Sequence, residues 1–125
     1  MAAIDCGVCV SGNFGCETEG YRCVIVRAGQ DWDCEECGRK IPRSTLYELA
    51  SGFTEGSHWN TKTCVICAEI AEAFCCHGRM HGNLWQDFED SEAFSKLTTA
   101  CFDKLKTVAA KTELRERWIE WRFEQ

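Results

Sequence analysis

The sequence of 125 residues contains a single proline, Pro42, and no repeat or low-complexity segment, so nothing in it marks a linker between separate domains. Residues 1–6 have neither a basic start nor an apolar run, and we expect no secretory signal. No stretch approaches the roughly 18 apolar residues that a membrane-spanning helix needs. These absences predict one cytoplasmic domain with no membrane partner, in a reducing compartment that keeps thiols free to bind metal.

Positive charge is also scarce. Fourteen Lys and Arg stand against 20 Asp and Glu, which gives a formal net charge of −6. A zinc ion held by four thiolates would add about two more negative charges. Duplex DNA carries one negative charge per ~1.7 Å and binds clustered Lys and Arg. The charge therefore argues against a general nucleic-acid binder and favours a protein partner.

The residues that common metal-dependent enzymes need are missing. A base deaminase uses His-x-Glu with Pro-Cys-x-x-Cys, and the chain has neither. For a histidine-metal nuclease only His58, Asn60 and His77 are available, at spacings that fit poorly. His77 and His81 are one helical turn apart, but nearby glycines weaken the helix they would need, so we interpret both as surface or rim residues. We expect no catalytic residues and no enzyme activity.

Cysteine is what the chain has in excess: 11 residues, about 9% of the sequence. Two Cys-x-x-Cys pairs, Cys34–Cys37 and Cys64–Cys67, have the spacing with which two pairs close a tetrahedral four-sulfur zinc site. Gly38 follows the first pair, where the tight turn of a zinc knuckle needs a positive φ. The alternative is four buried or disulfide-bonded cysteines. We predict one zinc ion at these four residues.

A second zinc site is the better explanation for cysteines in the amino-terminal loop, which has no core to bury them. Cysteines of this loop and of the predicted end of the first helix are the candidate ligands: Cys6, Cys9, Cys16, Cys75 and Cys76. Either Cys75 or Cys76 would complete the site, because helix geometry places Cys76 ~13 Å from Cys67, too far to share the first metal. Cys23 is the alternative to the helix cysteine as fourth ligand, but packing in a strand is enough to explain it. We expect Cys101 to lie in the core.

The order of elements predicts a small α+β zinc-stabilised domain, with a treble-clef-like knuckle, β-hairpin and helix followed by a C-terminal helical segment. Residues 1–82 form the zinc-binding region, and residues 83–125 form a helical extension packed on it within the same domain. The expected strands are 21–27, 44–51 and 58–62. Helices are expected from Cys64, from Ser91 through Cys101, and from an N-cap at Thr107.

Two features suggest a surface for a partner. The last helix is rich in large apolar side chains: Trp118, Ile119, Trp121 and Phe123. Such residues are enriched at protein interfaces, but they are equally compatible with an ordinary hydrophobic core. A short acidic segment precedes it and is read as a solvated helix face: Asp87, Glu89, Asp90 and Glu92. We predict that the protein binds its partner through this acidic segment and the exposed edge of the last helix.

The run Cys34-x-x-Cys37-Gly38-Arg39-x-Ile41, the segment Lys62-Thr63-Cys64-x-x-Cys67 and the sequence Ala73-Phe74-Cys75 resemble a group of small uncharacterised bacteriophage and prophage zinc-binding proteins. The likeness covers most of residues 16–122 and departs at Lys106-Thr107, where a proline is expected. It implies a small accessory protein in the cytoplasm of an infected bacterium. Such proteins commonly bind and redirect host proteins, including defence complexes. The alternative is a nucleic-acid-binding zinc-finger regulator.

Overall fold

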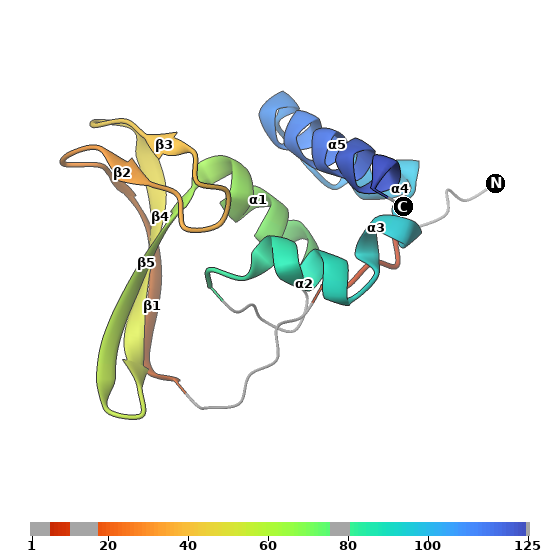
Figure 1. The fold of residues 1–125 in the computed structure, drawn as a ribbon. Helices are drawn as coiled ribbons and strands as arrows, with labels where there is room; N and C mark the ends of the chain where they lie inside the picture. Colours follow the sequence, from red (N-terminus) through yellow and green to blue (C-terminus); the bar gives the residue numbers. More distant parts are fainter. Residues whose placement is uncertain (1–5, 11–17, 76–80, 125) are drawn as a thin grey trace.

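The computed structural model describes residues 6–10, 18–75 and 81–124. Its strands come first in the chain: β1 (Thr18–Arg27), β2 (Trp32–Asp33), β3 (Lys40–Ile41), β4 (Leu46–Thr54) and β5 (Ser57–Cys64). The helices follow: α1 (Val65–Phe74), α2 (Leu84–Asp90), α3 (Ala93–Lys96), α4 (Thr99–Asp103) and α5 (Val108–Phe123). Figure 1 shows the long sheet on one side and the helices gathered on the other, with α1 between the sheet and α5.

The larger sheet is antiparallel, with the strand order β1-β4-β5. The expected β-hairpin is formed by β4 and β5, and its turn residues Glu55 and Gly56 have φ angles of 53° and 82°, as a two-residue hairpin turn of the right twist requires. β1 begins three residues before the predicted strand, and β5 runs past the prediction at both ends, whereas β4 begins two residues later and ends three residues later than predicted. Hydrogen bonds between neighbouring strands continue over polar residues. These residues lack the alternation of apolar and polar side chains by which a strand is predicted from sequence. β2 and β3 form a separate small hairpin around the first cysteine pair.

The core lies where the helices meet the base of the sheet. Phe74 and Phe88 are fully buried and meet edge to face, with ring centroids 5.7 Å apart. α1 packs on α5 and on the ends of β4 and β5, and Leu114 of α5 is fully buried in the same cluster. The predicted fold class, a small α+β domain with knuckle, hairpin, helix and C-terminal helical segment, is thus confirmed.

One predicted helix is wrong. Residues 91–101 form two short helices because Leu97 between them is extended, with φ −65° and ψ 135°. Ser91 does not cap the second element; its N–H donates to the Asp87 carbonyl oxygen and closes α2. Glu92 then adopts a left-handed conformation, with φ 59°. The two breaks allow Phe94 and Cys101 to enter the core from separate short helices.

The predicted start of the last helix is confirmed. The Thr107 hydroxyl oxygen accepts a hydrogen bond from the Ala110 N–H at 3.2 Å, which satisfies one of the unpaired donors of the first turn. Glu69 of α1 stabilises the same helix start, because its carboxylate accepts hydrogen bonds from the backbone N–H groups of Lys106 and Thr107 at 2.6 and 3.1 Å. α1 therefore holds the end of α5 at which the helix begins.

Candidate metal centre

The four cysteines of the predicted zinc site come together from the small hairpin and the junction of β5 with α1. In the knuckle, Cys34 N–H donates to the Arg39 carbonyl oxygen at 2.8 Å, and Gly38 N–H donates to the Cys34 carbonyl oxygen at 2.9 Å. Gly38 has φ 77°, the left-handed conformation that glycine adopts without strain. Cys64 ends β5 and is the N-cap of α1, and Cys67 lies in the first helical turn.

The distances between the sulfurs suit a tetrahedral metal. All four Sγ atoms lie within 4.8 Å of one another, and the Sγ atoms of Cys37 and Cys64 are 3.8 Å apart. A zinc–sulfur bond of about 2.3 Å in a tetrahedron places ligand sulfurs ~3.8 Å apart. Cys34, Cys64 and Cys67 are buried, and Cys37 is partly buried. The cluster could hold one metal ion, as predicted.

Backbone N–H groups point at these sulfurs, as they do around metal-bound thiolates. Cys34 Sγ accepts from the N–H groups of Glu36 at 3.4 Å and of Cys64 at 3.3 Å. Cys37 Sγ accepts from Arg39 N–H at 3.4 Å, and Cys64 Sγ accepts from Cys67 N–H at 3.5 Å. The backbone is arranged to stabilise negative charge on sulfur.

The protein alone does not stabilise four thiolates. Burial raises the pKa of the Cys37 thiol to about 11. Hydrogen bonds with Cys34 and Cys64, together with burial, raise the pKa of Cys67. Hydrogen bonds with Cys64 and Cys67 lower the pKa of Cys34. Without a cation the coupled sulfurs share protons, whereas a bound dication favours deprotonation of all four.

Arg39 connects this centre to α5. Its guanidinium Nη1 lies 3.7 Å from the sulfurs of both Cys37 and Cys64, and its Nη2 donates to Glu113 Oε1 at 2.6 Å. Glu113 is buried and also accepts from Arg117 Nε at 2.6 Å. Burial acts to raise the pKa of Glu113, but the bonds from Arg39 and Arg117 outweigh it and lower the pKa. The sequence pattern did not predict this chain of contacts; the one local signal for it was the i, i+4 spacing of Glu113 and Arg117.

The two glutamates between the first cysteines reach other elements. Glu35 Oε2 accepts from the Lys62 N–H of β5 at 2.6 Å, and the Lys62 carbonyl oxygen accepts from Glu35 N–H at 2.9 Å. Glu36 accepts from the N–H groups of Gly82 at 3.1 Å and Leu84 at 3.0 Å, at the start of α2. The knuckle thus joins β5, α2 and α5 through Glu35, Glu36 and Arg39. A change in its conformation would reach all three elements.

The candidates for the second site are only partly described. Cys16 and Cys76 lie outside the described residues, and Cys75 is half-buried at the end of α1. Cys6 forms a disulfide with Cys101 of α4, and Cys9 is also disulfide-bonded. Cys101 is fully buried, as predicted, but its pairing with the amino-terminal segment was not predicted. Cys23, expected to be packed, is exposed on β1.

The acidic part of the predicted partner surface needs correction. Asp87 is not solvated: it is buried and accepts from Asn83 Nδ2 at 2.8 Å. Burial raises its pKa, so reversing its charge would disturb α2. Glu89, Asp90 and Glu92 are exposed, as expected. Of the histidines considered for catalysis, His58 packs on Phe53, and His77 lies outside the described residues.

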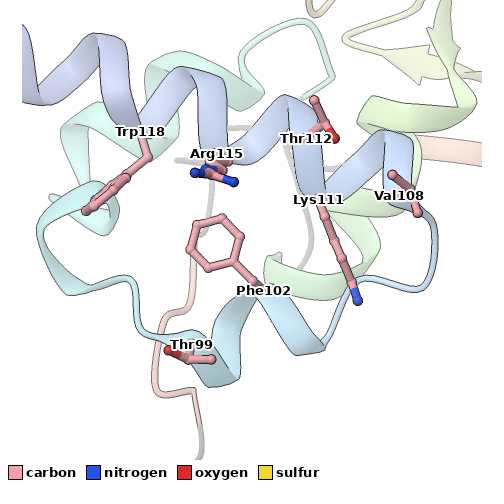
Figure 2. Close-up of a pocket in the computed structure, with 7 residues that line it drawn as sticks. All are labelled: Thr99, Phe102, Val108, Lys111, Thr112, Arg115 and Trp118. Atoms are coloured by element: carbon pink, nitrogen blue, oxygen red, sulfur yellow. The ribbon is translucent and has the colours of Figure 1, made fainter.

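A groove of about 390 Å³ runs between α4 and α5. Figure 2 shows Phe102 extending from α4 toward α5, with Trp118 at one end of the groove and Val108 at the other. Lys111 and Arg115 also line it, and among the residues that the structure describes neither has an acidic partner. Val108 is 80% exposed. The groove is therefore apolar along its floor and cationic along one side.

No protein-family model matches the chain, and comparison with curated proteins and with solved structures gives no significant match. Within the described residues, no helix has the length and apolar character needed to cross a bilayer. The site therefore stands on its own geometry, which is that of a four-thiol metal centre.

Proposed function

We propose that this chain is a non-enzymatic zinc-binding protein in which the metal organises a surface for another protein. Zinc is the metal best suited to four thiolates in a tetrahedron, and such closed sites are structural because no coordination position is left for substrate. With zinc bound, the knuckle, hairpin and helix would form a treble clef. The metal would supply much of the folding free energy of so small a chain.

The groove between α4 and α5 is the observation that carries the binding role. Aromatic side chains there can contribute a large apolar contact at little entropic cost. Lys111 and Arg115 favour an occupant that combines apolar and acidic side chains, since neither cation is neutralised within the described residues. In this proposal the partner binds the groove side of the last helix, where the local charge is positive, whereas the sequence prediction combined that helix with the acidic segment.

The resemblance to phage and prophage zinc proteins supports a biological setting. In this proposal the chain is a phage accessory protein in the bacterial cytoplasm, and its partner is a host protein, which includes the subunits of a defence complex. The alternative, a nucleic-acid-binding regulator, is opposed by the net charge of −6. Two cations in the groove are too few to offset that charge.

The test compares charge reversals inside and outside the groove. The first variant carries Lys111→Glu and Arg115→Glu. The control carries Arg22→Glu and Arg43→Glu, both exposed and distant in sequence, so that the two proteins have the same net charge. A host protein that co-purifies with the wild type and the control, but not with the groove variant, would then be purified and its binding measured directly.

We expect that direct binding to weaken at higher salt, because the attraction is partly electrostatic. Equal capture of host proteins by both variants would refute the groove as the binding surface. Micromolar or tighter binding to random duplex DNA at physiological salt would refute the protein-partner reading and support the regulator.

A further inference from the structure

A second hollow continues the groove along α5. It has a volume of about 430 Å³ and is lined by Ile119, Arg122 and Phe123. Trp118 lies at the nearer end of the groove, as Figure 2 shows. The Cζ atom of Arg122 lies 4.8 Å from the centroid of the Trp118 ring. Because one residue of each hollow takes part in that contact, the two hollows adjoin.

Both hollows lie on one face of α5. Val108, Arg115 and Arg122 follow one another at intervals of seven residues, which is two turns of helix and returns each side chain to the same side. Leu114, on the opposite side, is fully buried. We call the face that runs from Val108 to Phe123 through both hollows the outer stripe. It is ~22 Å long at 1.5 Å per residue.

The outer stripe is apolar at its two ends and positively charged along its length. Val108 and Phe123 are 80% and 85% exposed. Lys111, Arg115 and Arg122 supply the charge, and among the residues that the structure describes none of the three forms an ion pair. Exposed large apolar side chains beside cations without acidic partners favour an occupant that is both apolar and acidic.

The backbone chemistry of this surface selects the form of that occupant. α4 and α5 use main-chain N–H and C=O groups within their own turns. The stripe therefore offers no row of backbone donors and acceptors to an extended segment, as the edge of a sheet does. A helix satisfies its own backbone and can pack its side-chain ridges between those of α4 and α5. The outer stripe thus fits a helix better than an extended strand.

From these features we infer that the occupant of the outer stripe is an amphipathic α-helix of about four turns, whose apolar side is bordered by Asp and Glu. Its apolar residues fill the two hollows, and its carboxylates approach Lys111, Arg115 and Arg122. The inference rests on the proposed function, since this helix belongs to the host protein. It adds the form of the bound segment and extends the binding surface beyond the groove to Arg122 and Phe123.

The test uses the full-length, zinc-loaded protein and three fluorescein-labelled peptides of about 16 residues, the length of four helical turns. The first has Leu at helical spacing with Glu beside it. The second has the same composition but alternates Leu and Glu, and the third replaces each Glu of the first by Lys. By fluorescence anisotropy, we expect the first peptide to bind roughly 10-fold more tightly than either of the others.

Two variants alter only the second hollow. Arg122→Glu and Phe123→Ala should each weaken binding of the first peptide roughly 5- to 10-fold. Their matched controls are Arg43→Glu and Phe53→Ala, which change exposed residues outside α5 and should leave that binding as in the wild type.

The inference is overturned if the alternating or the basic peptide binds as tightly as the first, if none of them binds, or if both variants of the second hollow bind like the wild type. It is also overturned if sedimentation shows that the free protein dimerises and that Arg122→Glu abolishes the dimer, because a second copy would then occupy the stripe. Capture of a host protein that still depends on Lys111 and Arg115 would, in each of these cases, leave the proposed function standing.

Discussion

Replacing Glu113 with glutamine tests whether the metal centre is supported from α5. Glutamine has nearly the same shape but no charge, and its amide N–H₂ must face one of the two guanidinium groups that Glu113 now binds. The carboxylate accepts from Arg39 and from Arg117, each at 2.6 Å. The variant therefore leaves one donor facing a donor, and the other guanidinium donates to a neutral amide oxygen instead of a carboxylate.

The expected cost follows from those two bonds. A hydrogen bond to a charged group contributes about 1.5–3 kcal/mol. The side chains of Arg39 and Arg117 are 41% and 27% exposed, so solvent screens part of that energy. We expect the free energy of unfolding to fall by about 2 kcal/mol, which lowers Tm by roughly 6–10 °C in a chain of this size. Glu116→Gln, the same change at an exposed position of α5, should have almost no effect.

Metal affinity distinguishes this reasoning from simple destabilisation. Arg39 contacts two of the four sulfurs, and loss of such outer contacts typically lowers metal affinity 10- to 100-fold. Competition with a chromophoric chelator, run well below the Tm of both proteins, should show that loss in Glu113→Gln and not in Glu116→Gln. Unchanged zinc affinity in a destabilised Glu113→Gln protein would refute the role of Arg39 at the metal.

The same variant has a defined pH dependence. The pKa of Glu113 is lowered in the folded state, so its stabilisation is complete above the ordinary carboxyl pKa and is lost as pH falls through the lowered value. Acid also protonates thiolates, in both proteins alike. The difference in stability between wild type and Glu113→Gln should therefore shrink as the solution is acidified. Chemical denaturation at a series of pH values measures it.

Three further changes test local parts of the structure. Cys64→Ser should lose one zinc by elemental analysis and aggregate, because Cys64 joins the knuckle to α1; a folded, zinc-replete Cys64→Ser protein would contradict this. Glu69→Ala should cost about 1–2 kcal/mol in urea denaturation through the lost contacts with Lys106 and Thr107, while the exposed Glu72→Ala should cost almost nothing; equal losses would contradict it. Gly38→Ala should cost about 1–2 kcal/mol, because its φ is 77° although an added Cβ would meet no atom within 4 Å; a loss near zero would show that the knuckle backbone relaxes.

Several features of the site were predictable because they depend on a few neighbouring residues. Each of these features depends only on residues a few positions apart: the spacing of Cys34 and Cys37, the glycine after them, and the position of Cys64 at the start of a helix. The same holds for the hairpin turn at Glu55 and Gly56 and for Thr107 as a cap. Hydrogen bonds and backbone angles in such motifs are satisfied locally, so sequence alone indicates them.

The errors arose where local patterns were compatible with more than one conformation. The apolar spacing of residues 91–101 suits one helix, but burial of Phe94 and Cys101 in the core requires a break at Leu97. The carboxylate of Asp87 looked like part of a solvated face, yet α2 buries it beside Asn83. Side-chain periodicity cannot tell which face the rest of the molecule will cover.

The sequence by itself determined the four candidate metal ligands, the order of knuckle, hairpin and helix, and the acidic balance of the chain, because these follow from residue type and short spacing. Only the tertiary structure decided that Arg39 meets Glu113, 74 residues away, and that Cys6 meets Cys101, 95 residues away. It also decided which cations line the groove of α5. Contacts at such separations depend on how the whole core packs, and no local rule of conformation extends that far.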